Sequence, residues 1–194
     1  MKNLILFCIA ACFASAANAA NVSASAQPVA ACRSTRGGSS VCLQAFQLNV
    51  TLNINAADIG LPGLVYLAVQ EKDGTLAYYS PSQQAWVAYT GGMIEPYLVY
   101  QGGLPPQVTF TTAKIDASPY VGTTVYVGYG ALQKADQDKI DSFIASVGQA
   151  NLNPLISMQH LQQTAVENDM RSNEKAAPIC VISSSRSKKP CGIY

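Results

Sequence analysis

The sequence has little charge. Of its 194 residues, 12% are charged, with 12 lysines and arginines against 11 acidic residues, and the formal net charge is +1. Such a balance provides no electrostatic footprint for nucleic acid and no general attraction to an anionic membrane. We therefore expect no nucleic acid among its partners.

Histidine is nearly absent, which limits the chemistry that the chain can perform. His160 is the only histidine, and no nucleophile motif lies near it, whereas a serine hydrolase needs a base beside its nucleophile. The cysteines lack the spacing of metal ligands. We therefore predict no catalytic residue, no metal site and no cofactor.

Acid pairs are the remaining route to catalysis, because two carboxylates can hydrolyse a glycosidic bond without histidine. The sequence cannot bring any two of its acids together, since isolated acids at turns are commonly caps or solvated loop residues. An acid-pair glycosidase is kept as a third alternative. Its candidates in the β-rich region are Asp58, Glu71, Asp73, Glu95 and Asp116.

Long apolar runs are confined to the beginning of the chain. Lys2, the apolar residues 4–14 and the small-residue pattern of residues 17–19 are typical of a secretory signal peptide. We expect residues 1–19 to be removed by cleavage after Ala19. The mature chain would then be periplasmic, extracellular or on the cell surface.

A second interpretation of the same segment is a lipoprotein signal. The residues Ile9-Ala10-Ala11-Cys12 resemble a lipobox, in which Cys12 would carry the lipid. This is the minority alternative, because the apolar run before Cys12 is short and a good cleavage site follows it. No later run reaches the roughly 18 apolar residues of a membrane span, so we expect no span after signal removal.

Cysteine number agrees with export. Cleavage after Ala19 leaves an even set in a compartment where disulfide bonds persist, and three pairings are open. We favour the two local pairs, each of which would close a polar loop and stabilise the fold by about 2–3 kcal/mol in the loop-entropy model. The local pairs are Cys32 with Cys42 and Cys180 with Cys191.

Alternating residues predict a β-rich region over residues 41–130. The strongest pattern is Phe46 to Ile54, which is typical of a half-buried antiparallel strand. Asp73-Gly74 predicts the turn of a hairpin between residues 64–70 and 76–80. Glycine and proline pairs separate the later strands, at a spacing typical of an all-β sandwich or barrel. Those later strands are predicted at residues 86–89, 97–100, 108–112 and 123–129.

The periodicity changes after Gly130. Four apolar residues fall on one helical face, with acids near the start of the helix and Gly148 at its end. A second, weaker stripe begins with an N-cap at Asn153 before Pro154 and continues to about Met170. We predict an amphipathic helical hairpin over residues 131–171. Its first stripe is Ile140, Phe143, Ile144 and Val147.

The chain after the helices is polar over residues 172–177 and 183–190. We predict a polar tail over residues 172–194, closed by the local disulfide bond and mobile in these two stretches. The segment Pro178–Ile182 can pair back as an edge strand.

Aromatic residues gather between residues 78 and 100. Amphipathic rings can stack on sugar faces or anchor a protein interface, and on a small β-domain they also fill the core. With the first helical stripe, they are the candidate interaction residues. The aromatic candidates are Tyr79, Trp86, Tyr89 and Tyr97.

Five motifs are more specific than the alternation that predicts the strands. Together they resemble a largely uncharacterised immunoglobulin-like domain of secreted, surface and pilus-associated proteins of Gram-negative bacteria, over about residues 58–130. The resemblance implies a β-sandwich and supplies no defined catalytic residues to carry over, and this chain departs from it by the helices after Gly130. The motifs are Asp58-Ile59-Gly60, Gly63-Leu64-Val65-Tyr66, Ser80-Pro81 before Trp86, Tyr89-Thr90-Gly91-Gly92, and Gly122-Thr123-Thr124-Val125-Tyr126-Val127-Gly128-Tyr129-Gly130.

These observations predict a mainly β protein, with an immunoglobulin-like β-sandwich followed by a C-terminal helical hairpin. Its expected parts are a signal peptide (1–19), a polar segment (20–40), a β-domain (41–130), helices (131–171) and a tail (172–194). We expect a noncatalytic structural or interaction protein of the bacterial envelope or cell surface, with an envelope or extracellular protein as partner and a pilus or secretion assembly as one setting. The alternative is a carbohydrate-binding or adhesive module that uses exposed aromatic residues.

Overall fold

The computed structural model describes residues 21–34, 40–112, 115–116, 122–148 and 157–181. The predicted signal peptide, the Asn153-Pro154 helix start and Cys191 lie outside these residues. The described chain is mainly antiparallel β-structure with two helices.

One sheet is built around the strand that the alternating pattern predicts. Strand β2 pairs with β1 along its whole length and with β7 and β8 on its other side. The predicted apolar face is confirmed, because Leu48, Val50 and Leu52 are fully buried. The strands of this sheet are β1 (Asn21–Ser34), β2 (Ser40–Asn53), β7 (Gln107–Thr111) and β8 (Ile115–Asp116).

The second sheet has the order β10-β9-β3-β4-β5, and β6 pairs with the first part of β3. The predicted hairpin is confirmed: β3 and β4 are antiparallel, and the Thr75 amide donates to the carboxylate of Asp73 in the turn. The strands are β3 (Gly63–Gln70), β4 (Leu76–Ser80), β5 (Ala85–Ala88), β6 (Leu98–Tyr100), β9 (Thr124–Ala131) and β10 (Ala176–Val181).

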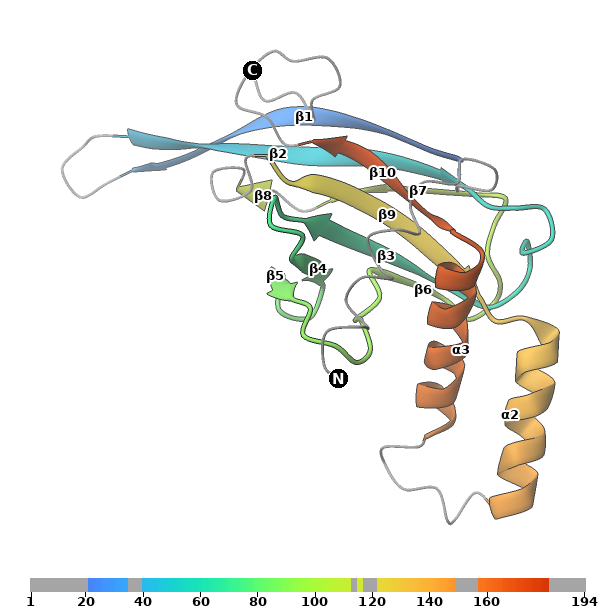
Figure 1. The fold of residues 1–194 in the computed structure, drawn as a ribbon. Coiled ribbons are helices and arrows are strands. Elements are labelled where there is room, and N and C mark those ends of the chain that lie inside the picture. The colour runs from blue at the N-terminus through green and yellow to red at the C-terminus, as the bar shows by residue number, and fades with distance from the viewer. Residues whose placement is uncertain (1–20, 35–39, 113–114, 117–121, 149–156, 182–194) are drawn as a thin grey trace.

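The two sheets share one apolar core. It contains Leu48 and Leu52 from β2 together with Leu67 from β3 and Val127 from β9. Figure 1 shows the β1-β2 ribbon on one side of the second sheet, with the two helices extending from one end in the opposite direction. Burial of these side chains is the main force that holds the sheets together.

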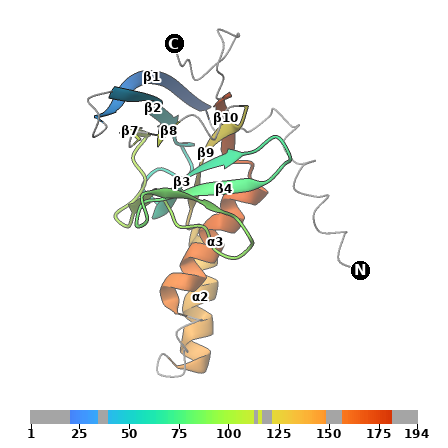
Figure 2. The ribbon, with the colours of Figure 1, turned by 90° about the vertical axis from the view of Figure 1, so that its left-hand side faces the viewer.

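The helices pack beside each other and against the second sheet. Helix α2 (Lys134–Val147) is followed by its C-cap Gly148, the predicted stop, and α3 (Met158–Ser172) contacts both α2 and β9. Both views show α2 and α3 side by side, with the sheet at one end of α3 (Figures 1 and 2). A second apolar cluster fills this contact and includes Tyr66, Ile140 and Val166.

Two features differ from the predictions. Residues 21–34, predicted as part of a polar segment, form β1; their small residues have weak strand propensity, and the long ladder with β2 decides their conformation. Helix α3 begins at Met158 because the Ser157 side chain accepts a hydrogen bond from the His160 amide. The prediction that a segment after the helices can pair back as an edge strand is confirmed, because β10 follows α3 and pairs with β9.

Candidate functional site

Three buried ionic side chains meet where α3 joins the second sheet. The Nζ atom of Lys175 lies 2.8 Å from Oδ2 of Asp58 and 2.7 Å from Oδ2 of Asp169. All three side chains are at most 5% exposed. We call Asp58, Lys175 and Asp169 the buried triad. Taking such charges out of water costs several kcal/mol per ion unless partners compensate for the lost hydration.

Each member of the buried triad comes from a different element. Asp58 lies in the loop after β2, where its amide donates to the Asn55 carbonyl. Asp169 belongs to α3, and Lys175 lies between α3 and β10. The main chain holds Lys175 in place, because its amide donates to Met170 and its carbonyl accepts from Tyr129.

Neutral donors complete the coordination of the two carboxylates. The Tyr129 hydroxyl donates to Oδ2 of Asp58 at 2.9 Å, and the side-chain amide of Gln133 donates to Oδ1 of Asp58 at 2.9 Å. The Ala131 amide donates to Oδ2 of Asp169 at 2.8 Å, and the Asn173 side chain donates to Oδ1 at 2.8 Å. Both carboxylates are therefore satisfied by hydrogen bonds.

The surroundings change the acidity of two members of this network. Burial alone would raise the pKa of Asp58, but the hydrogen bonds from Lys175, Gln133 and Tyr129, with the charge of Lys175, outweigh it and hold the pKa below its ordinary value. Burial, and then the nearby carboxylates, raise the pKa of Tyr129. The tyrosine therefore stays a protonated donor.

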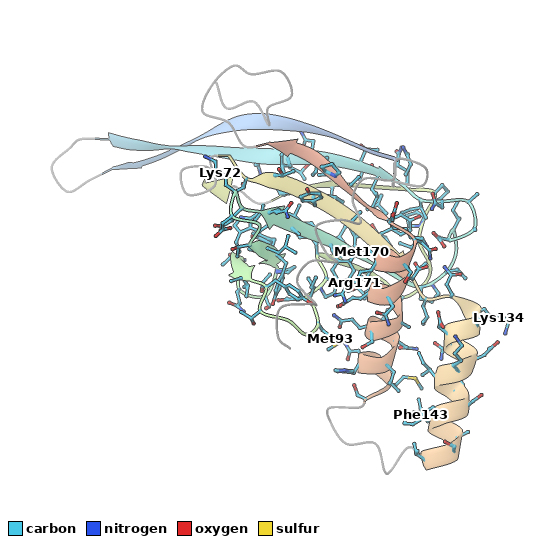
Figure 3. All side chains as sticks on the ribbon, viewed as in Figure 1. Lys72, Met93, Lys134, Phe143, Met170 and Arg171 are labelled. Carbon is cyan, nitrogen blue, oxygen red and sulfur yellow. The ribbon has the colours of Figure 1, made fainter. Side chains whose placement is uncertain are left out.

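A second buried carboxylate ties α3 to the loop between β5 and β6. Glu167 accepts from the Ile94 amide at 3.0 Å and from the Gln163 side chain at 3.1 Å. Arg171 donates to it at 3.2 Å and also contacts the Tyr89 hydroxyl at 3.4 Å. Figure 3 shows Arg171 on α3 near the loop that carries Met93. These bonds fasten the loop to α3, and an opening lies between α3 and β6.

That opening is a cleft of about 340 Å³ between the β3-β6 pair and α3. Apolar side chains line part of it, including Leu64, Leu132 and Val99. Val99 is 54% exposed, more than the other exposed large apolar residues of the described chain. Amide side chains of α3 line the cleft as well, and they are Gln159, Gln162 and Gln163. The cleft therefore combines apolar contact area with hydrogen-bonding groups.

The loop beside the cleft also carries a pH-sensitive contact. Glu95 accepts hydrogen bonds from the Ser80 hydroxyl and from the amide and hydroxyl of Ser82. These bonds, led by that of Ser80, hold the pKa of Glu95 below its ordinary value. A carboxyl whose pKa is lowered by folding stabilises the fold above its ordinary pKa, and this contribution is lost as the pH falls through the lowered value.

We expect Glu95→Gln to be less stable than the wild-type protein at neutral pH, and the difference to shrink as the pH falls below about 4. Urea denaturation at a series of pH values measures it. Glu71→Gln is the matched control, because Glu71 is exposed in the β3-β4 turn. A difference between Glu95→Gln and wild type that stays constant down to low pH would contradict the assignment.

The aromatic candidates divide between core and loop. Tyr79, Trp86 and Tyr97 form an edge-to-face cluster with centroid distances of 5.4 Å and 5.8 Å, and Tyr79 is only 7% exposed. Tyr89 contacts Arg171 and donates to the Gly92 carbonyl. These contacts favour core packing over a ring platform for sugars.

The helical candidates divide as well. Ile140 is buried and Ile144 packs against the same second cluster, so these two residues join α2 to α3. Phe143 is 42% exposed and lies on the half of α2 that is farther from the sheets (Figure 3). Val147 is partly buried in the last turn. The predicted stripe therefore covers one intramolecular contact and leaves one large ring on the surface.

For three of the cysteine candidates, the structure gives the position in a strand. The register sets Cys32 of β1 directly opposite Cys42 of β2, and Cys180 lies in β10. This register is compatible with the predicted disulfide bond between Cys32 and Cys42, and the bond itself stays a prediction.

Sequence reasoning missed two members of the buried triad. Asp58 is one of the candidate acids, but Lys175 belongs to the predicted polar tail and Asp169 to the weak second stripe. The catalytic acid pair of a glycosidase needs two carboxylates that face a shared cleft. Asp58 and Asp169 do not form such a pair, because both side chains are buried. Among the described residues, no group of three potential ligands could hold a metal ion.

Comparison with protein-family models, with curated proteins and with solved structures finds no match. Within the described residues, neither helix has the length and apolar character needed to cross a membrane.

Proposed function

We propose that this protein is an exported, noncatalytic interaction protein of the bacterial envelope or cell surface. One role that fits this proposal is that of an accessory component of a pilus or secretion assembly. The observation that carries the proposal is the cleft beside β6, with the exposed Val99 at its edge. Apolar surface rimmed by polar side chains is typical of protein interaction sites. The signal-peptide pattern of residues 1–19 supports export.

The finer fold belongs to the same proposal. We infer an immunoglobulin-like β-sandwich with a helical hairpin inserted before its last strand. The shared core of the two antiparallel sheets supports the sandwich, and the contact of α2 with α3, including the Gln162–Gln137 hydrogen bond of 2.8 Å, supports the hairpin. In this arrangement α3 packs on the second sheet and forms one wall of the cleft.

The glycan-binding alternative has less support. Its leading ring, Trp86, packs against the core together with Tyr79 and Tyr97. Tyr100 lines the cleft beside the glutamines and is the ring best placed for a sugar. A protein partner would bury more of the exposed apolar side chain of Val99 than a sugar would, so a protein partner is our first proposal.

We expect the immobilised mature protein to retain a protein from the solubilised envelope of its own cells, and Val99→Asp to weaken that retention about tenfold or more. The introduced carboxylate would be buried in an apolar contact, whereas in the free protein position 99 is exposed and tolerates it. Quantitative mass spectrometry of the retained proteins measures the effect.

Thr109→Asp is the matched control, because Thr109 is an exposed β7 residue in the other sheet. It should retain the partner as the wild type does. Phe143→Asp tests the helical surface separately. Retention that is unchanged in both Val99→Asp and Phe143→Asp would reject the proposed surface, and specific binding to a glycan panel without a protein partner would favour the alternative.

A further inference from the structure

The buried triad brings an amine to a carboxyl group in a site without exposure to water. Lys175 Nζ lies 2.8 Å from Oδ2 of Asp58, and a second carboxylate, Asp169, lies 2.7 Å from the same nitrogen. In water a lysine and an aspartate stay ionised and solvated, which keeps them from reacting. Burial removes the solvation and holds the two groups in contact, which are the two conditions that favour an intramolecular reaction.

We propose that Lys175 and Asp58 form an intramolecular amide (isopeptide) bond, with Asp169 as the catalytic proton carrier. The reaction joins the Lys175 nitrogen to Cγ of Asp58 and breaks one carbon–oxygen bond of the Asp58 carboxyl group. The ammonium and the carboxylate together yield one amide and one water molecule. No oxidant, cofactor or external group is required.

Proton transfer can be followed atom by atom. Asp169 first accepts a proton from Nζ and passes it to an oxygen of Asp58, which turns the ion pair into a neutral amine and a neutral carboxylic acid. The amine then attacks Cγ of this acid, and Asp169 carries a second proton from Nζ to the same Asp58 oxygen, which leaves as water. The 2.7 Å contact with Nζ and the bond from the Ala131 amide hold Asp169 in position for this role.

Donors at Asp58 stabilise the charge that develops during the attack. The Tyr129 hydroxyl donates to Oδ2 and the Gln133 amide donates to Oδ1, so both oxygens are polarised before the reaction begins. The Tyr129 hydroxyl also accepts from the Asn55 amide, which fixes its orientation. Asp169 accepts from the main chain, from Asn173 and, at 3.4 Å, from the Gln133 side chain, but it has no hydroxyl donor among its described bonds. We therefore assign Asp58 as the electrophile.

The product would join parts of the chain that are distant in sequence. The bond links the loop after β2 to the junction of α3 and β10, and it would fasten the inserted helices to the sheet covalently. In an exported protein, a bond of this kind resists unfolding and proteolysis without depending on the redox state.

Peptide mapping tests the proposal. The protein purified from its own cells is unfolded, reduced, alkylated and digested with trypsin. Trypsin does not cleave after an acylated lysine, so we expect residues 172–186 to remain one peptide, attached to the Asp58 peptide of residues 37–72. The pair should be lighter than the sum of the two peptides by one water molecule. Tandem mass spectrometry locates the branch at Lys175.

Two variants test the roles. Asp169→Asn should lose the branched peptide while its circular dichroism stays that of the wild type. Lys134→Arg, at the exposed Lys134–Asp138 pair, should keep it. Cleavage after Lys175 in the wild-type protein, or a branch to the Asp169 peptide of residues 140–171, would overturn the proposal. A bond that persists in Asp169→Asn would overturn the role of Asp169.

Discussion

Replacing Lys175 with methionine is expected to lower the free energy of unfolding by about 3–5 kcal/mol. Methionine has a similar length, so the change removes charge and hydrogen bonds more than volume. It leaves Asp58 and Asp169 buried, adjacent and without their cation. Two carboxylates in that position must take up a proton or draw in water, and both responses destabilise the folded state. Loss of the proposed amide bond would increase the difference further.

Urea denaturation at neutral pH measures this effect, and Lys134→Met is the matched control. Lys134 also pairs with an aspartate, at 3.0 Å, but its side chain is 84% exposed. An exposed pair of this kind contributes about 0.5 kcal/mol or less. If the two variants lose the same stability, the buried triad does not stabilise the fold.

Local pattern was enough to predict the strands that the described chain contains in its middle. The alternation from Phe46 to Ile54 predicts which residues of β2 are buried, because a strand with one solvated face separates apolar from polar positions directly in the sequence. Asp73-Gly74 predicts the β3-β4 turn for a similar local reason. Strand β1 gives no such signal, since its conformation depends on the partner strand.

The buried triad could not be predicted from local pattern. Its three members are far apart in sequence or lie in segments that look solvated, and Lys175 is followed and preceded by polar or small residues. A lysine in such a segment is normally exposed. Lys175 comes to lie beside Asp58 and α3 only because β10, which follows it, pairs with β9. The cleft also lies outside local pattern, because one of its walls is α3 and the facing residues come from β3 and β6.

The sequence predicts a strand over residues 123–129, and the alternation of this segment has a second meaning. Val125, Val127 and Tyr129 point into the core that the two sheets share. The opposite face of β9 carries Gly128 and Gly130, and α3 packs on this face. Glycine leaves room for the helix backbone to approach the strand closely. The pattern thus encodes a core on one side and a helix contact on the other.

The closeness of that contact makes Gly130→Ala the second large prediction. A Cβ atom at Gly130 would lie 2.0 Å from the carbonyl oxygen of Val166 and 2.8 Å from its Cγ1 atom. The nearest atom belongs to the helix backbone, so no change of side-chain rotamer relieves the overlap, and α3 must move away from β9. Overpacking of this severity is expected to cost about 3 kcal/mol of unfolding free energy.

Moving α3 would also separate Asp169 from the Ala131 amide and from Lys175, so the loss should extend to the buried triad. Hydrogen exchange reports this directly: the α3 amides should exchange faster in Gly130→Ala, while the β2 amides, which pair with β1 and β7, should change less. Gly102→Ala is the control, because an added Cβ there meets no atom within 4 Å. If Gly130→Ala keeps the stability and the α3 protection of Gly102→Ala, then α3 does not rest on β9 in solution, and neither the cleft nor the triad could be formed as described.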